Sequence, residues 1–211
     1  MEYRTVAVEA QDEFIEKRSR FIGYIKPVTT EEEAIAFIED IRTKHWNATH
    51  NVYAYCLREG GLCRYSDDGE PSGTAGQPVL SVLTKGGITD AVVVVTRYFG
   101  GVLLGAGGLV RAYSHGAALA VAAGKPIVMR QCRICAVQCD YSQYGRVSTL
   151  IPEVGGFIDD SAFAENVEIT FHLTDEQLGV LGRKLADATC GQCEVTVLGE
   201  EFFACPDTAE E

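Results

Sequence analysis

The pattern of apolar and polar positions divides the first part of the chain into strands and helices. Apolar residues at every second position are typical of strands, and apolar residues at every third or fourth position are typical of helices. The segment ITDAVVVVTRYF is rich in β-branched residues without polar alternation, which predicts a strand buried on both faces. We expect strands at residues 4–8, 14–28, 50–59 and 88–99, helices at residues 29–46 and 76–84, and a glycine-rich turn followed by a long helix at residues 100–123.

The predicted helix at residues 29–46 has a defined start and a defined buried face. Thr30 is a candidate N-cap and Glu33 lies three residues later, so the two form a capping-box sequence. The apolar face of this helix is expected to consist of Ala34, Ile35, Ile38 and Ile41.

Gly124, Lys125 and Pro126 end the long helix and mark the best domain boundary in the chain. The elements predicted beyond them follow the order βαββαβ, which is that of the ferredoxin-like unit, a two-layer sandwich. We therefore expect an α+β protein with one domain at residues 1–125 and a ferredoxin-like domain at residues 126–211. The elements of the second domain are predicted at residues 127–139, 141–151, 155–162, 166–173, 174–189 and 194–203.

Charge is distributed unevenly between these two parts. The net charge is −12, and residues 1–125 carry 13 basic and 15 acidic side chains, whereas residues 126–211 carry 5 basic and 15 acidic side chains. Nucleic-acid binding needs a basic surface. A phosphate-binding surface is therefore expected only as a local patch on the first part, and the acidic second part is expected to dock on protein or to set the angle between the domains.

The sequence predicts a cytoplasmic protein that does not interact with a membrane. It has no apolar run of about 18 residues, and its first residues, MEYRTVAVEAQDEF, lack the basic and apolar regions of a secretory signal.

The eight cysteines are expected to be thiols packed in a core within a reducing compartment. Two C-x-x-C pairs, Cys132/Cys135 and Cys190/Cys193, leave a zinc site as the alternative. The first pair lies in a predicted strand, where Cys132 and Cys135 would point to opposite faces.

An acidic loop, RYSDDGEPSGTAGQPVLS, contains the densest group of acids in the chain, Asp67, Asp68 and Glu70. Their order does not fit a calcium-binding EF-hand, but the carboxylates could hold Mg²⁺ or act as a paired general acid and base. The simpler alternative is that one aspartate caps the helix beginning at Gly76 or forms a turn. Two neighbouring polar side chains, Ser66 and Thr74, are supporting candidates.

A glycine-rich turn, TRYFGGVLLGAGGLVRAY, lies between a predicted strand and a predicted helix. Such turns present backbone N–H groups to a phosphate or carboxylate, although this one is neither a Walker P-loop nor a dinucleotide fingerprint. Arg97 and Arg111 could converge on that anion. In the alternative, the glycines allow close helix–sheet packing and the arginines pair with Asp67, Asp68 or Glu70. The glycines are Gly100, Gly101, Gly105, Gly107 and Gly108.

Three further residues belong to the predicted cleft. Arg64 and Tyr98 are candidate anion contacts, and His50 is a candidate general base, although a histidine at a strand end is more often structural. The segment Lys17-Arg18-Ser19-Arg20 places basic side chains beside Phe14 and Phe21 and could be a nucleic-acid contact strip or a charged edge strand.

These motifs resemble the YigZ/IMPACT family. The resemblance rests on EKRSRF, THNVYAYCL, SDDGEPSGTAGQPVLSVL and TDAVVVVTRYFGGVLLGAGGLVRAY, which span about residues 13–115. It implies an N-terminal domain like domain 2 of ribosomal protein S5 and a C-terminal ferredoxin-like domain, two folds that also occur in translation elongation factor G. Eukaryotic members regulate translation under amino-acid starvation through an additional RWD domain that these 211 residues do not contain, so we do not expect that mechanism here.

We expect a non-enzymatic, translation-associated regulator that binds RNA, the ribosome or a ribosome-associated protein through this cleft, without DNA sequence readout. One alternative is a Mg²⁺-dependent enzyme that acts on a phosphate-bearing small molecule in the same cleft. The other is a structural interaction module in which the cleft serves only the folding of the protein. The sequence specifies neither the ligand nor the oligomeric state.

Overall fold

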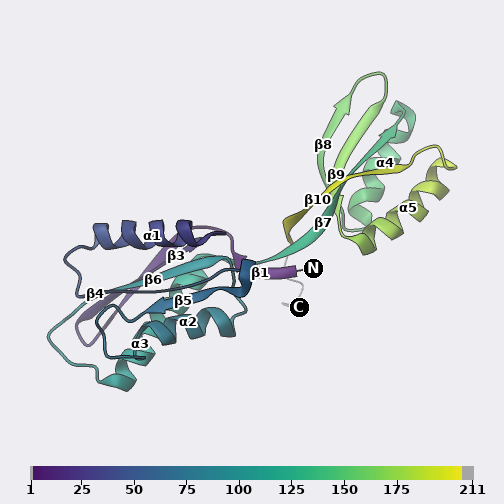
Figure 1. Ribbon diagram of the computed structural model, residues 1–211. Coiled ribbons are helices and arrows are strands. Elements are labelled where there is room, and N and C mark those ends of the chain that lie inside the picture. The colour runs from purple at the N-terminus through teal and green to yellow at the C-terminus, as the bar shows by residue number, and fades with distance from the viewer. Residues whose placement is uncertain (1, 206–211) are drawn as a thin grey trace. The chain divides into compact units, whose positions relative to one another are not determined.

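The computed structural model describes residues 2–205 and divides them into two compact units. The larger unit is Tyr3–Val128, and the smaller unit consists of Met129–Cys205 with Glu2 (Figure 1). Both combine helices with antiparallel sheets, so the α+β prediction is confirmed. None of the described helices has the length and hydropathy needed to cross a membrane.

The larger unit is built on a five-stranded sheet with the order β2-β3-β6-β4-β5, in which all neighbours are antiparallel. Helix α1 covers one face, and α2 and α3 cover the other (Figure 1). The strands are β2 (Ala10–Glu16), β3 (Ser19–Pro27), β4 (His50–Cys56), β5 (Cys63–Ser66) and β6 (Ala91–Tyr98); the helices are α1 (Glu31–Lys44), α2 (Gly76–Lys85) and α3 (Ala106–Ala123).

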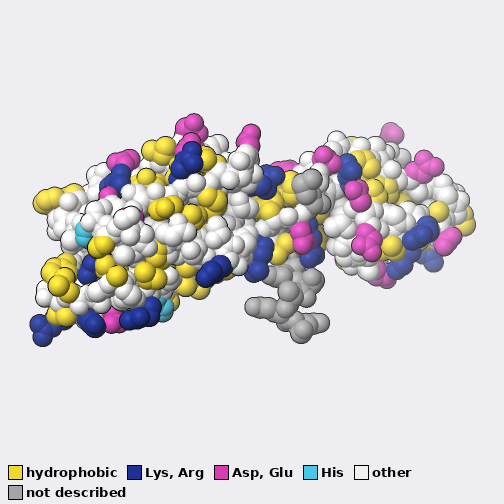
Figure 2. Space-filling view, turned by 60° about the horizontal axis from the view of Figure 1, so that its bottom comes forward, with side chains coloured by type: hydrophobic (Ala, Val, Ile, Leu, Met, Phe, Trp, Pro, Cys, Tyr) yellow, Lys and Arg dark blue, Asp and Glu magenta, His cyan; other side chains and the backbone are white. Residues whose placement is uncertain are grey.

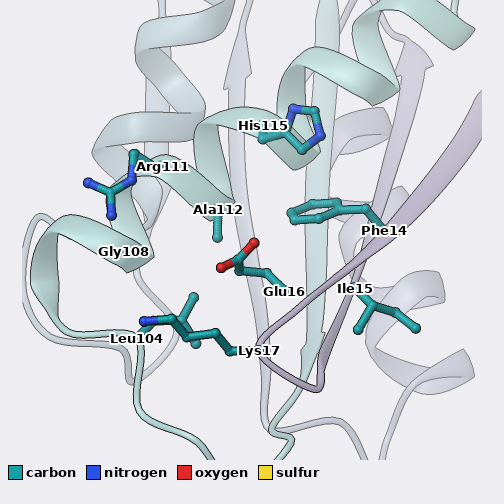
Figure 3. Close-up of a pocket in the computed structure, with 9 residues that line it drawn as sticks. All are labelled: Phe14, Ile15, Glu16, Lys17, Leu104, Gly108, Arg111, Ala112 and His115. Carbon is teal, nitrogen blue, oxygen red and sulfur yellow. The ribbon is translucent and has the colours of Figure 1, made fainter.

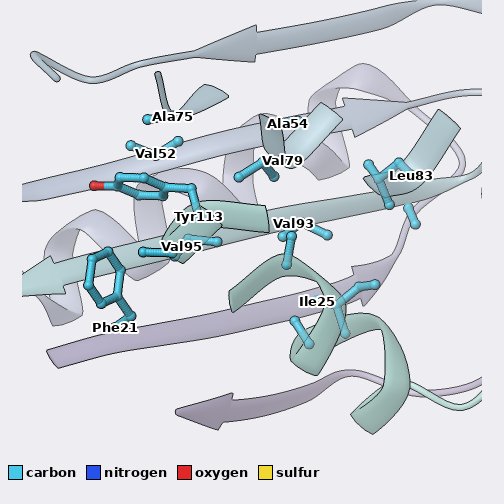
Figure 4. Close-up of a cluster of buried hydrophobic side chains, with 14 of the residues drawn as sticks. Phe21, Ile25, Val52, Ala54, Ala75, Val79, Leu83, Val93, Val95 and Tyr113 are labelled. Atoms are coloured by element: carbon cyan, nitrogen blue, oxygen red, sulfur yellow. The ribbon is translucent and has the colours of Figure 1, made fainter. Parts of the chain in front are cut away.

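Strand β6 lies in the middle of this sheet and is buried on both faces, as its valines predict. Val93 and Val95 face the core under α2 and α3, where Tyr113 and Phe21 also lie (Figure 4). Val92 and Val94 face the second core, under α1. The alternation of side chains along β6 therefore decides which helix each residue meets.

The structure contains a hairpin where the sequence suggested one continuous strand at residues 14–28. Strand β2 ends at Glu16 and β3 begins at Ser19, and the two are paired directly. Lys17 and Arg18 form the turn with φ angles of 45° and 66°. A two-residue hairpin turn with both φ angles positive usually contains Asn or Gly. Lys17 and Arg18 therefore did not indicate a turn in the sequence.

Helix α1 has the predicted capping box, in which Thr30 accepts from the Glu33 N–H and Glu33 accepts from the Thr30 N–H. Its predicted buried face is wrong at one position. Ile35 is 49% exposed, and Phe37 is buried instead.

The smaller unit has the ferredoxin-like fold. Its sheet follows the order β8-β9-β7-β10, and β7 also pairs with β1. Helices α4 and α5 pack on one face of this sheet. The elements of this unit are β7 (Pro126–Cys139), whose first three residues belong to the larger unit, α4 (Tyr141–Glu153), β8 (Phe157–Phe163), β9 (Val167–Leu173), α5 (Asp175–Thr189) and β10 (Val195–Cys205). Strand β1 (Glu2–Val6) belongs to the larger unit from Tyr3 onward.

The cysteines only partly follow the prediction of packed thiols. Cys56 and Cys63 form a disulfide, because antiparallel pairing of β4 and β5 brings their Cα atoms to 4.2 Å. Burial raises the pKa of the Cys132 thiol to about 11. The buried free thiols are Cys132, Cys135, Cys139 and Cys193, whereas Cys190 is exposed and Cys205 is half-buried.

Candidate anion-binding site

Asp67 is a helix cap. Its carboxylate accepts hydrogen bonds from the backbone N–H groups of Gly73, Ala75 and Gly76 at 2.8–3.1 Å. Helix α2 begins at Gly76, and the side chain of Ala75 cannot cap it. Asp67 thus satisfies N–H groups that a helix start leaves without partners. The simpler alternative from the sequence is confirmed for this residue.

Asp68 holds the acidic loop against β4. Its carboxylate accepts from the backbone N–H of Asn51 at 2.6 Å and from Nη2 of Arg42 at 3.2 Å. Its backbone oxygen accepts from Nδ1 of His50 at 2.8 Å. The loop is therefore tied to the start of β4 through both the side chain and the backbone of one residue.

Ser66 and Thr74 also support the loop. The Ser66 hydroxyl accepts from the Asp68 N–H at 3.1 Å. The Thr74 hydroxyl donates to the backbone oxygen of Pro71 at 2.6 Å. Both side chains are thus engaged in local turns.

Glu70 is buried and is the centre of a polar network. Its Oε1 accepts from Nη1 of Arg97 at 2.6 Å and from the Tyr113 hydroxyl at 2.7 Å, and Nε2 of His50 lies 3.6 Å away. Burial, and next the neighbouring Glu70 carboxylate, raise the pKa of the Tyr113 hydroxyl. Glu70 therefore joins the acidic loop to β6 and α3 inside the unit.

Arg97 is committed to this internal network. Its side chain is 5% exposed and lies between the rings of Phe21 and Phe99, at 5.4 Å from each ring centre. Its Nη2 donates to Ser19 Oγ at 3.4 Å, and its buried Nε has no hydrogen-bond partner among the described residues. The prediction that Arg97 faces an open cleft is wrong, and the alternative of pairing with the acidic loop is confirmed.

The three carboxylates of the acidic loop do not converge on one point. Asp67 faces the start of α2, Asp68 faces Arg42, and Glu70 faces Arg97. No group of three or more His, Cys, Asp or Glu side chains within residues 2–205 is arranged to hold a metal ion. The three acids of the loop therefore do not form the shared Mg²⁺ site that the sequence allowed.

Tyr98 and Arg64 lie on the other face of the sheet. The Tyr98 hydroxyl lies 2.8 Å from Nδ1 of His45, which is buried and also contacts the Tyr24 hydroxyl at 2.6 Å. Burial lowers the pKa of His45. Arg64 is exposed and lies opposite Tyr55, which belongs to the core under α1. The predicted cleft therefore does not bring Tyr98 and Arg64 together with Arg97.

Gly100 allows the glycine-rich turn to approach the β2–β3 hairpin. A Cβ atom on Gly100 would lie 2.1 Å from the backbone of Arg18. The Gly100 N–H donates to Ser19 Oγ at 3.2 Å. This close approach holds the glycine-rich turn against the hairpin, which differs from the helix–sheet packing that the sequence suggested for the glycines.

The remaining glycines shape the start of α3. Gly101 and Gly105 have φ angles of 83° and 74°, which side chains rarely adopt. Gly107 and Gly108 lie in the first turn, and a Cβ on Gly108 would approach the Leu104 Cβ to 2.9 Å.

A cavity of about 490 Å³ lies between the hairpin and the first turns of α3. Figure 3 shows Glu16 and Lys17 reaching from the hairpin toward the helix that carries Arg111. The lining residues are Phe14, Ile15, Glu16, Lys17, Leu104, Gly108, Arg111, Ala112 and His115.

The cations at this cavity are accessible. Lys17 and Arg111, which line it, are exposed, as is Arg18 at the hairpin turn, and none of the three forms an ion pair with a residue that the structure describes. Nη1 of Arg111 lies 3.7 Å from the Cβ position of Gly107, so the guanidinium folds back along the first turn of α3. This turn contains no acidic residue and no capping side chain. The positive end of the helix and a cation thus lie together, an arrangement that favours a bound anion.

Sequence analysis found part of this site. Lys17 belongs to the predicted basic strip, and Arg111 was a predicted anion contact. Phe14 and His115, whose rings lie 4.6 Å apart at the cavity, come from segments about a hundred residues apart and share no sequence motif. The partners of Arg97, which are Ser19 and Glu70, also depend on the tertiary fold.

Family models and similar proteins place this chain in the same family. The Impact N-terminal domain matches residues 17–121, and a domain of unknown function, DUF1949, matches residues 137–192. The IMPACT family member YvyE of Bacillus subtilis is 37% identical over 194 residues, which is 92% of this chain and 89% of that protein. The IMPACT family member YigZ of Escherichia coli is 33% identical over 187 residues, which is 87% and 92%.

A eukaryotic relative and a crystal structure also match this chain. Protein IMPACT of Bos taurus is 33% identical over 96 residues, which is 43% of this chain and 30% of that protein. A crystal structure described as that of a hypothetical protein is 32% identical with a TM-score of 0.59, and the match covers 95% of this chain and 98% of the other.

Proposed function

Because the chain belongs to the IMPACT family, we propose that it is a cytoplasmic regulator of translation that acts by binding RNA. The proposed binding surface is the hairpin–α3 site, defined as Lys17 and Arg111, which line the cavity at the start of α3, together with Arg18 at the adjoining hairpin turn. RNA alone or RNA within the ribosome would present the same phosphate groups to these cations.

The observation that carries the proposal is the accessible positive charge at the start of α3. A cation can contact a phosphate group only if it is exposed to solvent and not already paired with a carboxylate. Arg97 cannot supply one because Glu70 already holds it. Lys17, Arg18 and Arg111 can, and Figure 2 shows Lys and Arg side chains along the edge of the larger unit where α3 begins.

Exposed aromatic rings at the same end of the sheet suit single-stranded RNA. Trp46 is 83% exposed and Phe99 is 45% exposed. The segments that carry them are joined, because the Phe99 N–H donates to Thr49 Oγ1 at 3.0 Å. Base stacking on such rings contributes about 1–3 kcal/mol per base and tolerates any sequence. The hairpin–α3 site would supply the phosphate contacts, and the exposed rings of Trp46 and Phe99 would supply stacking surfaces.

A salt series tests this proposal. We expect filter binding of a uridine-rich RNA to weaken steeply with salt, and the Lys17→Ala, Arg111→Ala double variant to lose two phosphate contacts. Each contact on a single strand contributes about 0.7 to the slope of log K against log salt. The slope of the double variant should therefore be smaller in magnitude by about 1.4 than that of the wild-type protein, and its RNA affinity should be lower.

A matched control removes two exposed cations elsewhere. The Lys85→Ala, Arg183→Ala double variant changes the net charge by the same amount and should leave the slope within about 0.3 of the wild-type value. Equal slopes for the two double variants would contradict the assignment of this surface, and absence of RNA binding by the wild-type protein would contradict the proposed function.

A further inference from the structure

The sheet of the smaller unit has one face that its own helices leave open. Helices α4 and α5 pack against the odd-numbered residues of β7 and β9, such as Val137 and Phe171. Side chains alternate along a strand, so the even-numbered residues of these strands point to the opposite face. Within residues 129–205, no helix covers that opposite face (Figure 1).

The open face carries a row of stacked rings. The ring of His172 on β9 lies 3.7 Å from that of Phe203 on β10 and 5.4 Å from that of Phe157 on β8, and both pairs are nearly parallel. Phe157 is 49% exposed, and Leu198 on β10 is 58% exposed. The face therefore presents apolar surface to solvent across several strands.

The same face carries two adjoining hollows of about 470 Å³ and 360 Å³. Gln138 and Glu168 line both hollows, and the Gln138 side chain donates to the Glu168 carboxylate at 3.0 Å. We call the two hollows together the acidic groove. Its small and apolar lining includes Ala136, Ala162 and Leu198, and its acidic lining consists of Glu165, Glu168 and Glu194.

The charges of the smaller unit are segregated. Neither hollow is lined by a Lys or Arg among the described residues. Arg133 pairs with Asp175 at the start of α5 and with Glu200, and Lys184 on α5 pairs with Glu153 on α4. Among the described residues, Glu165, Glu168 and Glu194 form no ion pair with a Lys or Arg, so the negative charge of the groove is uncompensated.

We propose that the acidic groove is a docking surface for a Lys/Arg-rich segment of another protein, with small or aliphatic residues between its cations. The acidic walls complement the cations, and the alanines and Leu198 accept the residues between them. Nucleic acid does not fit, because its phosphates would face three carboxylates. This proposal concerns a surface other than the hairpin–α3 site and does not depend on RNA binding there.

A labelled peptide tests the docking surface in the full chain. The probe is a fluorescein-labelled peptide that repeats Lys-Leu-Lys-Ala, and its binding is followed by fluorescence anisotropy. We expect the Glu168→Lys, Glu194→Lys double variant to weaken binding about tenfold or more, because two attractive contacts become repulsive. A peptide that repeats Glu-Leu-Glu-Ala should not bind the wild-type protein.

The matched control reverses two acids on α5. The Glu176→Lys, Asp187→Lys double variant has the same net charge as the groove variant and should bind the peptide within about twofold of the wild-type affinity. Thermal unfolding of both variants verifies that they fold, and filter binding of RNA by the groove variant should remain at least as strong as for the wild-type protein.

Three results would overturn the proposal. The first is that the wild-type protein does not bind the basic peptide, and the second is that both double variants weaken binding equally, which would indicate only the general negative charge of the unit. The third is a dimer, detected by sedimentation, that the groove variant alone abolishes, which would assign the groove to a second copy of the chain.

Discussion

At the scale of single residues, two arginines that the sequence assigned to one cleft lie in different environments. Arg97 and Arg111 were predicted to act together on an anion, but Arg97 is buried with Glu70 and Arg111 is exposed at the cavity. The residues alone could not separate them, because an arginine at a strand end faces either a core or solvent according to its parity along the strand. Arg97 faces the core because it pairs there with the buried carboxylate of Glu70.

The buried pair of Glu70 and Arg97 should contribute more to the free energy of unfolding than an exposed ion pair does. We expect Glu70→Ala to lower the free energy of unfolding by about 3–5 kcal/mol, because it leaves the Arg97 guanidinium buried without a counter-charge. It also removes the acceptor of the Tyr113 hydroxyl. Urea denaturation followed by circular dichroism measures the change.

The control for this prediction breaks an exposed pair of the same chemistry. Glu39→Ala removes the pair between Glu39 and Arg42, whose side chains are 59% and 35% exposed, and should cost less than about 1 kcal/mol. Similar losses in the two variants would show that the Glu70 network is not the internal support described above.

At the scale of elements, periodicity and capping predicted most of the fold. The capping box of α1, the doubly buried β6 and the βαββαβ order of the smaller unit are confirmed. The β2–β3 hairpin was missed because Lys17 and Arg18 adopt positive φ angles without being Gly or Asn. The disulfide between Cys56 and Cys63 was missed because strand β5 was not predicted, so no pairing placed the two residues opposite each other.

The contact between the hairpin and the glycine-rich turn should be sensitive to a single methyl group. We expect Gly100→Ala to lower stability by about 1–3 kcal/mol, because the new Cβ would meet the backbone of Arg18 and force the two segments apart. The same displacement moves Lys17 away from the start of α3, so RNA affinity should fall as well. Thermal unfolding and filter binding measure the two effects.

Gly101→Ala is the comparison for this prediction. Gly101 has a φ angle of 83° and nothing near its Cβ position, so alanine there meets only backbone strain of about 1–2 kcal/mol. Its RNA affinity should remain near the wild-type value. If Gly100→Ala binds RNA as well as Gly101→Ala does, the packing of the turn against the hairpin does not position the cations.

At the scale of the whole molecule, the chain joins two units with different electrostatic surfaces. The larger unit is nearly neutral but gathers accessible cations at the hairpin–α3 site, and the smaller unit carries most of the net charge of −12. Charge counts along the sequence predicted this division of charge. They could not locate either surface, since the hairpin–α3 site depends on a missed turn and the acidic groove depends on the register of four strands.

The position of bound RNA on the full chain is the most direct test of the central claim that free cations at the start of α3 bind phosphate. Ultraviolet cross-linking of a uridine-rich RNA, followed by mass spectrometry of the linked peptides, should identify peptides that contain Lys17, Trp46 or Phe99. Cross-links found only within residues 129–205 would contradict the claim.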